Sequence, residues 1–274
     1  MKLIIFSDLD GTFLNNNTYS FGSLKDYINS FRFDFELIFV SSKTFAEISR
    51  IQKDLNLNFP VIAENGACII FPKDYLRQKI INKSFFKYGD YFFLSLTALN
   101  SDKIVEKFSL LKKKYMFSFF SELSEDKLKH VTNLDSESLK LSKLRNFTNP
   151  IYWQDTQENK KIFKNDISNI NSSFSILEGG RFMHVSDNYD KGVALKKFLE
   201  IKNNHEKSYT TISLGDSEND LPMLEQTDFS CIIKSRSKIY LKKKKNIIYK
   251  SKMVAPNGWK ESLNFILNKG IKNF

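Results

Sequence analysis

Cysteine, histidine and long apolar runs are scarce in this chain of 274 residues. Its two cysteines, Cys68 and Cys231, show no metal-type spacing, so neither a disulfide framework nor a zinc cluster is indicated. No apolar run approaches the roughly 20 residues that span a bilayer. The apolar stretch at the N-terminus is interrupted by Asp8, too early for the core of a signal peptide. We therefore expect a cytoplasmic protein without a membrane partner.

Aromatic–basic interleaving of the kind that binds nucleic acid is also missing, although the chain is strongly basic. With 42 lysines and arginines against 31 acidic residues, the net charge is +11. Lysine clusters at 112–114 and 242–245 could bind nucleic acid, could steer an anionic substrate, or could simply be solvated. Lys, Asn, Ile and Phe are frequent throughout, which dilutes any inference from charge. We expect no nucleic-acid partner.

Strand–helix alternation is present at both ends of the chain. Near-continuous apolar runs at residues 2–7, 35–40 and 60–63 fit buried parallel strands. Thr44 and Glu47 have capping-box spacing, which predicts a helix to about Leu55, and Asn65-Gly66 predicts a tight hairpin into residues 67–71. In the last third we expect helices at 191–201, 221–226 and 258–267, and strands at 210–214 and 229–233.

The middle of the chain, from about residue 84 to 180, has a different pattern. We expect helices at 101–114 and 160–170, and strands within 85–98 and at 117–121, 151–154, 174–177 and 181–185. This α+β pattern predicts a small sheet covered by helices. The whole chain therefore predicts an α/β fold: a doubly wound, Rossmann-like parallel sheet core (residues 1–83 and 185–274) with an inserted α+β cap domain (84–184).

Polar clusters follow the expected parallel strands. Open α/β sheets have their binding and catalytic sites outside these carboxyl ends of the strands. Asp8 and Asp10 follow the first strand, and Asp216 follows a strand in the last third. Close carboxylates repel one another in a dry site, and a bound divalent cation resolves that repulsion. An oxygen-only ligand set, without a competing histidine or cysteine cluster, suits Mg²⁺. We therefore predict a Mg²⁺ site formed by Asp8, Asp10 and Asp216.

The same carboxylates permit phosphoryl transfer. A carboxylate that attacks phosphorus forms an aspartyl-phosphate. A second carboxylate can protonate the leaving alkoxide and then deprotonate the hydrolytic water. Ser42, the backbone after Asp8 and a lysine are candidates to hold the charge on the transferring phosphoryl group.

Four sequence motifs occur in an order that is typical of one superfamily. They are Asp8-Leu9-Asp10-Gly11-Thr12, a serine at the end of the next strand, Lys191-Gly192, and Gly215-Asp216-Ser217-Glu218-Asn219-Asp220. The chain thereby resembles the haloacid dehalogenase superfamily of phosphotransferases, and its insert resembles the large α+β cap of the sugar-phosphatase branch. The resemblance implies that Asp8 is the nucleophile and a metal ligand. It also implies that Asp10 is the general acid/base and ligates through its backbone carbonyl.

The resemblance implies roles for the remaining motif residues. Ser42, or the serine before it, and Lys191 would be catalytic, and Asp216 would be a metal ligand. Asn219 and Asp220 would support the metal and phosphate shell.

Several of these residues also have a purely structural explanation. Asp8 and Asp10 could be turn residues before a glycine, and Lys191 could be a solvated residue in the first turn of a helix. Asp220 could support a helix start, since it has capping-box spacing with Ser217.

Within the superfamily, several local strings are similar to those of mannosyl-3-phosphoglycerate phosphatases. The strings are Ser41-Ser42-Lys43-Thr44, Glu64-Asn65-Gly66-Ala67, Arg145-Asn146-Phe147-Thr148-Asn149-Pro150, Gly179-Gly180-Arg181-Phe182-Met183-His184, Gly215-Asp216-Ser217-Glu218-Asn219-Asp220-Leu221-Pro222-Met223-Leu224 and Pro256-Asn257-Gly258-Trp259. The resemblance implies a phosphoric monoester hydrolase that converts a glycosyl-3-phosphoglycerate to phosphate and a glycosylglycerate, a compatible solute. Asn149 stands where an acidic residue is common, so mannosyl and glucosyl substrates both stay open.

Such a substrate carries a phosphate, a carboxylate and a sugar. Lys43 and Arg181 could bind its anionic groups, Arg181 bidentately. Glu64 and Asn65 could bind sugar hydroxyls, because an unpaired buried hydroxyl costs roughly 1–3 kcal/mol. The candidate substrate-binding residues are Lys43, Thr44, Glu64, Asn65, Gly66 and Arg181.

Structural explanations exist for parts of this set as well. Thr44 with Glu47 could be only a helix cap, and Asn65-Gly66 could be only a hairpin turn. His184 could be a packed residue of the cap domain rather than a ligand. Other functions also stay open: a phosphatase of other sugar phosphates, a phosphomutase of the same fold, and a non-enzymatic binding protein.

Overall fold

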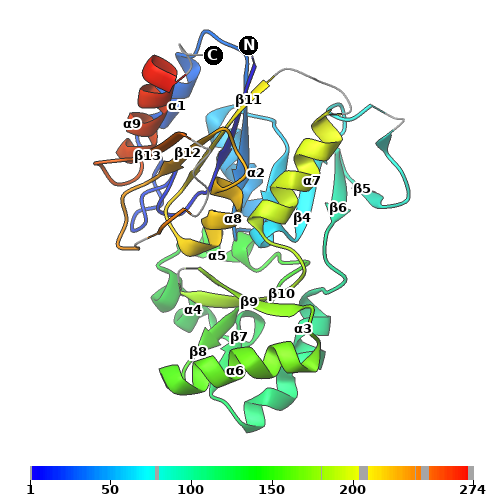
Figure 1. Cartoon of the computed structure of the whole chain (residues 1–274). Helices are drawn as coiled ribbons and strands as arrows, with labels where there is room; N and C mark the ends of the chain where they lie inside the picture. The colour runs from blue at the N-terminus through cyan, green and yellow to red at the C-terminus, as the bar shows by residue number, and fades with distance from the viewer. Residues whose placement is uncertain are drawn as a thin grey trace.

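The computed structural model describes residues 2–77, 80–179, 181–203, 209–237, 239–241 and 247–270. The lysine cluster at 242–245 and Gly180 lie outside these residues. The described chain forms a large sheet flanked by helices and a smaller sheet with helices of its own, one above the other in Figure 1. In this described part, no helix combines the length and the apolar character that crossing a membrane requires.

The large sheet contains the strands that were expected at both ends of the chain. Its strands are β1 (Lys2–Ser7), β2 (Phe35–Val40), β3 (Val61–Ala63), β4 (Cys68–Pro72), β5 (Phe85–Tyr88), β6 (Tyr91–Ser95), β11 (Tyr209–Gly215), β12 (Phe229–Ile232) and β13 (Ile247–Lys250). Their order is β13-β12-β11-β1-β2-β3-β4-β6-β5. Neighbours from β13 to β3 pair in parallel, and β4, β6 and β5 extend the sheet as antiparallel strands.

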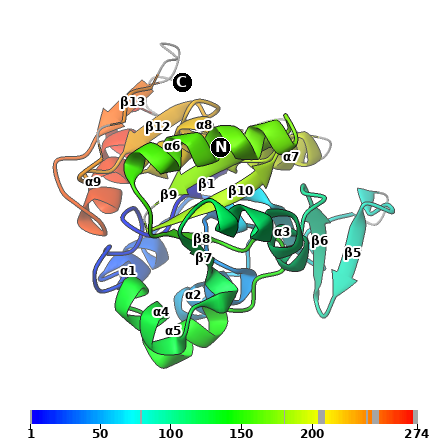
Figure 2. The same ribbon diagram turned by 90° about the horizontal axis from the view of Figure 1, so that it is seen from below.

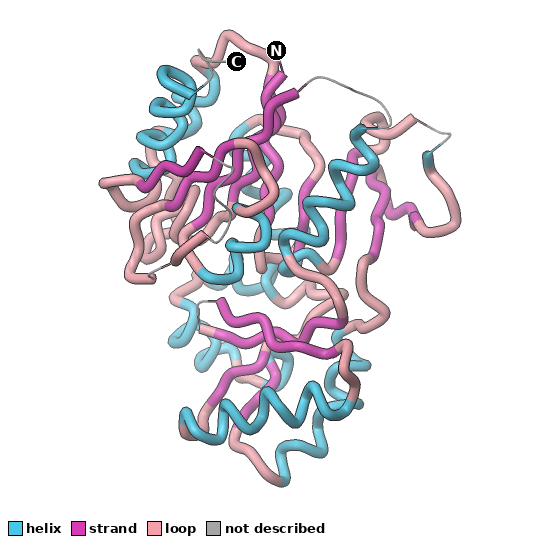
Figure 3. The backbone as a smooth tube through the Cα atoms, in the orientation of Figure 1, coloured by secondary structure: helices cyan, strands magenta, loops and turns pink. Residues whose placement is uncertain are grey.

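Both faces of the large sheet are covered. Successive residues of a strand point to opposite faces, so each strand contributes side chains to both layers. In β1, Leu3 and Ile5 pack into one hydrophobic layer, and Ile4 and Phe6 pack into the other. Helices α1 (Leu24–Asn29), α2 (Phe45–Leu55) and α9 (Asn257–Phe265) contribute to the first layer, and α7 (Lys191–Asn203) and α8 (Leu221–Leu224) to the second. Figure 3 shows these helices on both sides of the strands.

The smaller sheet is antiparallel and has a separate hydrophobic core. Its strands β7 (Phe117–Phe119), β8 (Ile151–Trp153), β9 (Phe174–Gly179) and β10 (Phe182–Asp187) lie in the order β7-β8-β10-β9. Ile104 and Phe108 of α3 (Ser101–Phe108) and Phe163 and Ile167 of α6 (Gln157–Ile170) pack into this core. Figure 2 shows α6 lying across β9 and β10. Two further helices, α4 (Glu125–Thr132) and α5 (Ser136–Ser142), pack around Phe120.

The strand order of the large sheet reverses beside β1. β2 pairs with one edge of β1, whereas β11, which follows the small sheet in the chain, pairs with the other edge. In open α/β sheets the site lies in the crevice outside the carboxyl ends of the strands at such a switch point. Asp8 directly follows β1 and Asp216 directly follows β11, so the fold brings both carboxylates to this crevice.

Most predicted elements are present with small shifts in their bounds. The predicted capping box is present, since Thr44 Oγ1 accepts from the Glu47 N–H at 3.2 Å and Glu47 Oε2 accepts from the Thr44 N–H at 2.9 Å. The predicted hairpin joins β3 to β4. The helix expected to reach Lys114 ends at Phe108 and continues as a 3₁₀ turn, Ser109–Lys113.

Residues 85–98 differ from their expected position in the cap domain. Their strands β5 and β6 extend the large sheet through pairing with β4, and Phe93 packs into the large sheet's hydrophobic layer. The division of the chain at residues 84 and 184 stays a prediction, and we propose that the cap domain begins after Ser95. Helices α1, α4 and α5, which have 6, 8 and 7 residues, were not predicted.

Candidate active site

Asp8 leaves the end of β1 beside a buried lysine. Lys191 Nζ, at the start of α7, donates to Asp8 Oδ1 and to Asp220 Oδ1, each at 2.6 Å. Lys191 is 2% exposed, Asp8 6% and Asp220 0%. The low exposure of Lys191 excludes the alternative of a solvated first-turn residue. One ammonium therefore joins the segments that follow β1 and β11.

Burial opposes the charged forms of the neighbouring acids. It raises the pKa of Asp8 to about 7, against the lowering effect of Lys191. It also raises the pKa of Asp216 to about 8, and the Asp220 and Asp8 carboxylates add to this shift. For Lys191 itself, the carboxylates of Asp220 and Asp8 outweigh burial, so its pKa lies above its ordinary value. The cluster is therefore short of positive charge, which is the condition that favours a bound cation.

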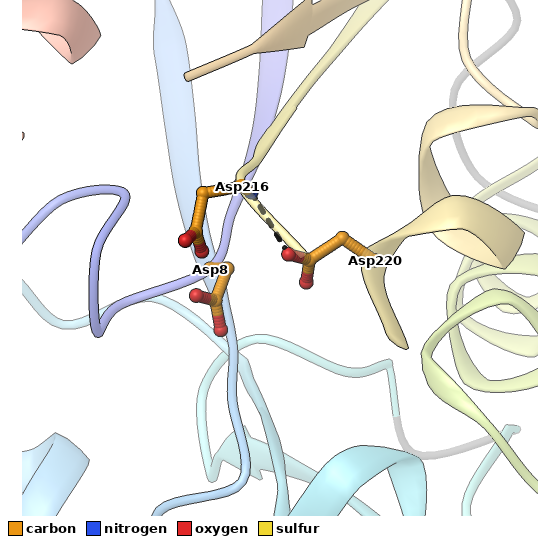
Figure 4. Close-up of side chains that lie close together, drawn as sticks. All are labelled: Asp8, Asp216 and Asp220. Carbon is orange, nitrogen blue, oxygen red and sulfur yellow. Dashed lines mark hydrogen bonds between the residues drawn. The ribbon is translucent and has the colours of Figure 1, made fainter. Parts of the chain in front are cut away.

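Three carboxylates of this cluster are candidates to hold that cation. Figure 4 shows Asp8, Asp216 and Asp220 together, and one carboxylate oxygen of each lies within 4.8 Å of the others. Asp220 Oδ2, however, accepts from the backbone N–H groups of Asp216 and Ser217 at 3.0 Å each, while Asp220 Oδ1 accepts from Lys191. Asp220 thus holds the loop after β11 and Lys191 in place. Asp8 and Asp216 offer the hard oxygen ligands that a divalent cation such as Mg²⁺ prefers.

Gly11 allows the loop after β1 to pass close to Asp216. Its φ is +85°, and a Cβ at this position would lie 2.7 Å from Asp216 Oδ2. Glycine has no Cβ and adopts positive φ freely, so it fits both requirements. Thr12 follows and donates from Oγ1 to Asp216 Oδ1 at 3.3 Å. The first motif therefore fixes the carboxylate of the fourth.

Asp10 faces the same cavity and is held by Lys43, the residue after Ser42 of the second motif. Asp10 Oδ2 pairs with Lys43 Nζ at 3.0 Å, and Asp10 Oδ1 is buried with no hydrogen-bond partner among the described residues. Lys43 also pairs with Glu47 at 3.5 Å and lies over the ring of Tyr19, 4.9 Å from its centroid. Two carboxylates therefore already share the charge of Lys43.

The hairpin turn Glu64–Gly66 anchors the loop that leads into β8. Glu64 is 1% exposed, and its carboxylate accepts from backbone N–H groups of residues 146–148, the shortest at 2.8 Å from Thr148. Asn65 Oδ1 accepts from Asn219 Nδ2 at 3.2 Å, while the buried Asn65 Nδ2 has no partner in the described structure. A Cβ on Gly66 would lie 2.2 Å from the carbonyl oxygen of Asp190. The turn thus packs against three separate segments.

A cavity of about 760 Å³ opens between the carboxyl ends of the parallel strands and the small sheet. The predicted site residues on its wall are Asp8, Asp10, Ser42, Lys43, Asp216, Asn219 and Arg181. The predicted site residues that are not on its wall are Thr44, Glu64, Asn65, Gly66, Lys191 and Asp220. The residues away from the wall make the internal hydrogen bonds and close packing described above, or in the case of Thr44 the helix cap.

Several further side chains on the cavity wall were not assigned from the sequence. Tyr19 joins the two parts of the molecule: its hydroxyl accepts from Arg181 Nη1 at 3.0 Å and donates to the Thr132 carbonyl at 2.6 Å. Arg145 and His184 also line the cavity. Both lie in strings that resemble the sugar-phosphatase relatives, which was an available signal, whereas nothing in the sequence around Tyr19 marks it.

The raised pKa of Asp216 predicts how the stability of the protein depends on pH. When a chelator keeps the site free of metal, the pKa of Asp216 in the folded protein is raised to about 8 from an ordinary value of 3.8. Between these two pH values, the folded state therefore binds more protons than the unfolded state. Folding stability then falls as the pH rises. We expect the free energy of unfolding of the wild type, relative to that of Asp216→Asn, to fall by at least about 1 kcal/mol from about pH 5 to about pH 8.

Urea denaturation of both proteins in EDTA measures this difference. A constant difference across this range, or one that grows with pH, would contradict the assignment. Addition of Mg²⁺ at the higher pH is expected to restore stability to the wild type and not to the variant, because the cation compensates the buried charges.

The sequence and the fold both match known proteins. The family described as haloacid dehalogenase-like hydrolase matches residues 5–254. A glucosyl-3-phosphoglycerate/mannosyl-3-phosphoglycerate phosphatase of Persephonella marina is 33% identical, with 97% of this chain and 98% of the relative covered. A protein of the same description from Methanococcoides burtonii is 30% identical, with 98% of each chain covered. A crystal structure from Thermoplasma acidophilum superposes with a TM-score of 0.66 at 15% identity, covering 98% of this chain and 97% of that one.

Proposed function

The chain belongs to the haloacid dehalogenase-like hydrolase family and is a phosphoric monoester hydrolase, and from this premise we propose that it hydrolyses a glycosyl-3-phosphoglycerate, glucosyl or mannosyl, to a glycosylglycerate and phosphate. The observation that carries the substrate is the 33% and 30% identity, over nearly whole chains, to two phosphatases described by both sugars. A soluble, small phosphorylated substrate is also consistent with a cavity whose wall carries both acidic and basic side chains. The expected cytoplasmic location stays a prediction.

In the proposed first step, an Asp8 carboxylate oxygen attacks phosphorus. The bond between phosphorus and the glycerate oxygen breaks, and Asp10 gives its proton to that leaving oxygen. The products of this step are an aspartyl-phosphate on Asp8 and the free glycosylglycerate. Asp10 suits this role because Lys43 holds it at the cavity wall while its buried Oδ1 has no hydrogen-bond partner in the described structure.

In the second step, water attacks the phosphorus of the aspartyl-phosphate. Asp10, now a carboxylate, takes a proton from this water, and the bond between phosphorus and Asp8 breaks. Phosphate leaves and Asp8 returns to its starting form. Lys191 balances the negative charge on Asp8 before the attack and again after the intermediate is hydrolysed, and Ser42 supplies a donor to the phosphoryl oxygens from the cavity wall.

Asp8, Asp216 and the backbone carbonyl of Asp10 would hold Mg²⁺ in this proposal. When bound, Mg²⁺ supplies positive charge to the transferring phosphoryl group and compensates the carboxylates. The neighbouring Asp220 and Asn219 support this site by fixing the loop after β11, Asp220 through its bonds to Asp216 and Ser217.

We propose positioning roles for most of the residues first considered for substrate binding. Lys43 orients Asp10, and Thr44 caps α2. Glu64 anchors the loop at residues 146–148, and Asn65 contacts Asn219. Arg181, which is exposed on the cavity wall, remains available to the substrate.

A panel of phosphorylated substrates tests this function. We expect glucosyl- or mannosyl-3-phosphoglycerate to be hydrolysed with a kcat/KM at least roughly 100-fold above that of simple hexose phosphates, since the cavity has room and charge for more than a phosphate. Activity should disappear in EDTA and return with Mg²⁺. Preference for hexose phosphates would contradict the substrate. Retention of labelled phosphate on the sugar, instead of its release, would indicate a phosphomutase.

A further inference from the structure

One arginine on the cavity wall differs from the other cations there. Lys43 pairs with two carboxylates, and Arg181, Lys234 and Arg236 are exposed to solvent. Arg145 is half-buried and has no carboxylate partner among the described residues. A partly desolvated guanidinium that makes no direct ion pair attracts an anionic ligand.

The guanidinium of Arg145 is held in a fixed orientation. Its Nη1 donates to the Ser42 carbonyl at 3.1 Å and to Thr148 Oγ1 at 3.2 Å, and its Cζ lies 5.3 Å from the centroid of the Phe120 ring. Its Nε is buried and makes no hydrogen bond within the described structure. The bonds to Ser42 and Thr148 thus both use Nη1, and Nε remains a donor without a hydrogen-bond partner in the described structure.

His184 on β10 also lines this wall and has a ring nitrogen without a hydrogen-bond partner among the described residues. The residue is 4% exposed, and this nitrogen is Nδ1. Burial, with smaller contributions from the charges of Arg145 and Lys191, lowers its pKa to about 3. His184 is therefore neutral near neutral pH and offers a hydrogen bond without adding charge.

Together these two residues present a single positive charge and at least one additional hydrogen-bonding atom. One positive charge matches a carboxylate, which carries one negative charge, better than a second phosphate. The flat guanidinium fork also matches the planar geometry of a carboxylate. The bond from Arg145 to the Ser42 carbonyl sets the guanidinium beside the residue proposed to hold the phosphate. In 3-phosphoglycerate a single carbon separates the carboxylate carbon from the carbon that bears the phosphate ester, so both anions need adjoining subsites.

We propose that Arg145 and His184 form a carboxylate subsite that binds the glycerate carboxylate of the substrate and so selects glycosyl-phosphoglycerates over sugar phosphates that lack a carboxylate. This assignment rests on the proposed function. It gives the cap domain and the loop before β8 a direct role in substrate choice.

Two substrates that differ only in the carboxylate test the subsite. One is the glycosyl-3-phosphoglycerate, and the other is the glycosylglycerol phosphate in which a hydroxymethyl group replaces the carboxylate. For Arg145→Met we expect kcat/KM on the first to fall roughly 10- to 100-fold, mostly through KM, as for loss of a charged hydrogen-bond pair. On the second, kcat/KM should change by less than about threefold. Arg145→Lys should recover part of the loss on the first substrate, and His184→Phe should lower the same preference by a smaller factor.

Arg181→Met is the matched control, because it removes another arginine from the same cavity. Arg181 bonds to the Tyr19 hydroxyl, which also bonds to Thr132, so its loss should alter both substrates by the same factor. Equal losses on both substrates for Arg145→Met, or no loss on either, would overturn the subsite. The proposed function fails in a different way: the wild type would then not prefer glycosyl-3-phosphoglycerate to hexose phosphates at all.

Discussion

Asp8→Asn is expected to lower kcat by more than about 10⁴-fold while the protein stays folded, since removal of a nucleophile has effects of this size. The amide has nearly the shape of the carboxylate and keeps an oxygen for Lys191, but it cannot attack phosphorus. Burial already disfavours the charge on Asp8, whose pKa is raised to about 7, so the neutral amide should be tolerated. Phosphate release at saturating substrate measures kcat, and circular dichroism with thermal unfolding checks the fold.

Asp90→Asn serves as the matched control for this experiment. Asp90 has a side chain that is 76% exposed and pairs with Lys73 on the surface, and it is not among the residues that line the cavity. Its replacement by the amide should leave kcat unchanged. If Asp8→Asn kept more than about a tenth of the wild-type activity, another group would have to be the nucleophile.

Lys191→Met is expected to weaken both the fold and the chemistry. Its removal leaves the Asp8 and Asp220 carboxylates buried without the ammonium that now bonds to each at 2.6 Å. Breaking a buried ion pair in this way costs about 3–5 kcal/mol. The loss of a fixed cation at the nucleophile should also lower kcat by about 10²- to 10³-fold. Urea denaturation gives the stability and initial-rate kinetics give kcat.

Lys202→Met separates these two effects. Lys202 is also buried, at 6% exposure, and its Nζ donates to Glu36 Oε1 at 2.6 Å, but it lies near the end of α7 rather than at the site. This variant should lose stability and keep its kcat. A loss of activity of the same size in both variants would mean that Lys191 acts only through folding.

The sequence predicts the end of the large sheet that carries the candidate site well because its signals are local. A short apolar run followed by Asp8-Leu9-Asp10-Gly11-Thr12 defines both the strand and the polar residues at its end, and the same holds for the strand before Asp216. Parallel pairing then brings the two ends together without further information. The capping box at Thr44 is equally local, since Glu47 lies one helical turn away.

Contacts between distant segments could not be predicted in this way. Glu64 satisfies N–H groups more than 80 positions further along the chain, and Tyr19 meets Thr132 and Arg181 across the cavity. No periodicity or motif encodes such pairs, because they depend on how the small sheet sits over the large one. For the same reason, the sequence could not show which sheet β5 and β6 join, since their aromatic residues suit either sheet.

The proposed mechanism requires a covalent phosphoryl group on Asp8. Borohydride reduces an aspartyl-phosphate to homoserine, which marks the residue that carried the phosphoryl group. The protein should therefore be mixed with glycosyl-3-phosphoglycerate and Mg²⁺, quenched with borohydride during turnover, digested and examined by mass spectrometry. Homoserine at position 8, dependent on both substrate and Mg²⁺, is the predicted result. Homoserine at another aspartate, such as Asp10 or Asp216, or at none while turnover proceeds, would contradict the account.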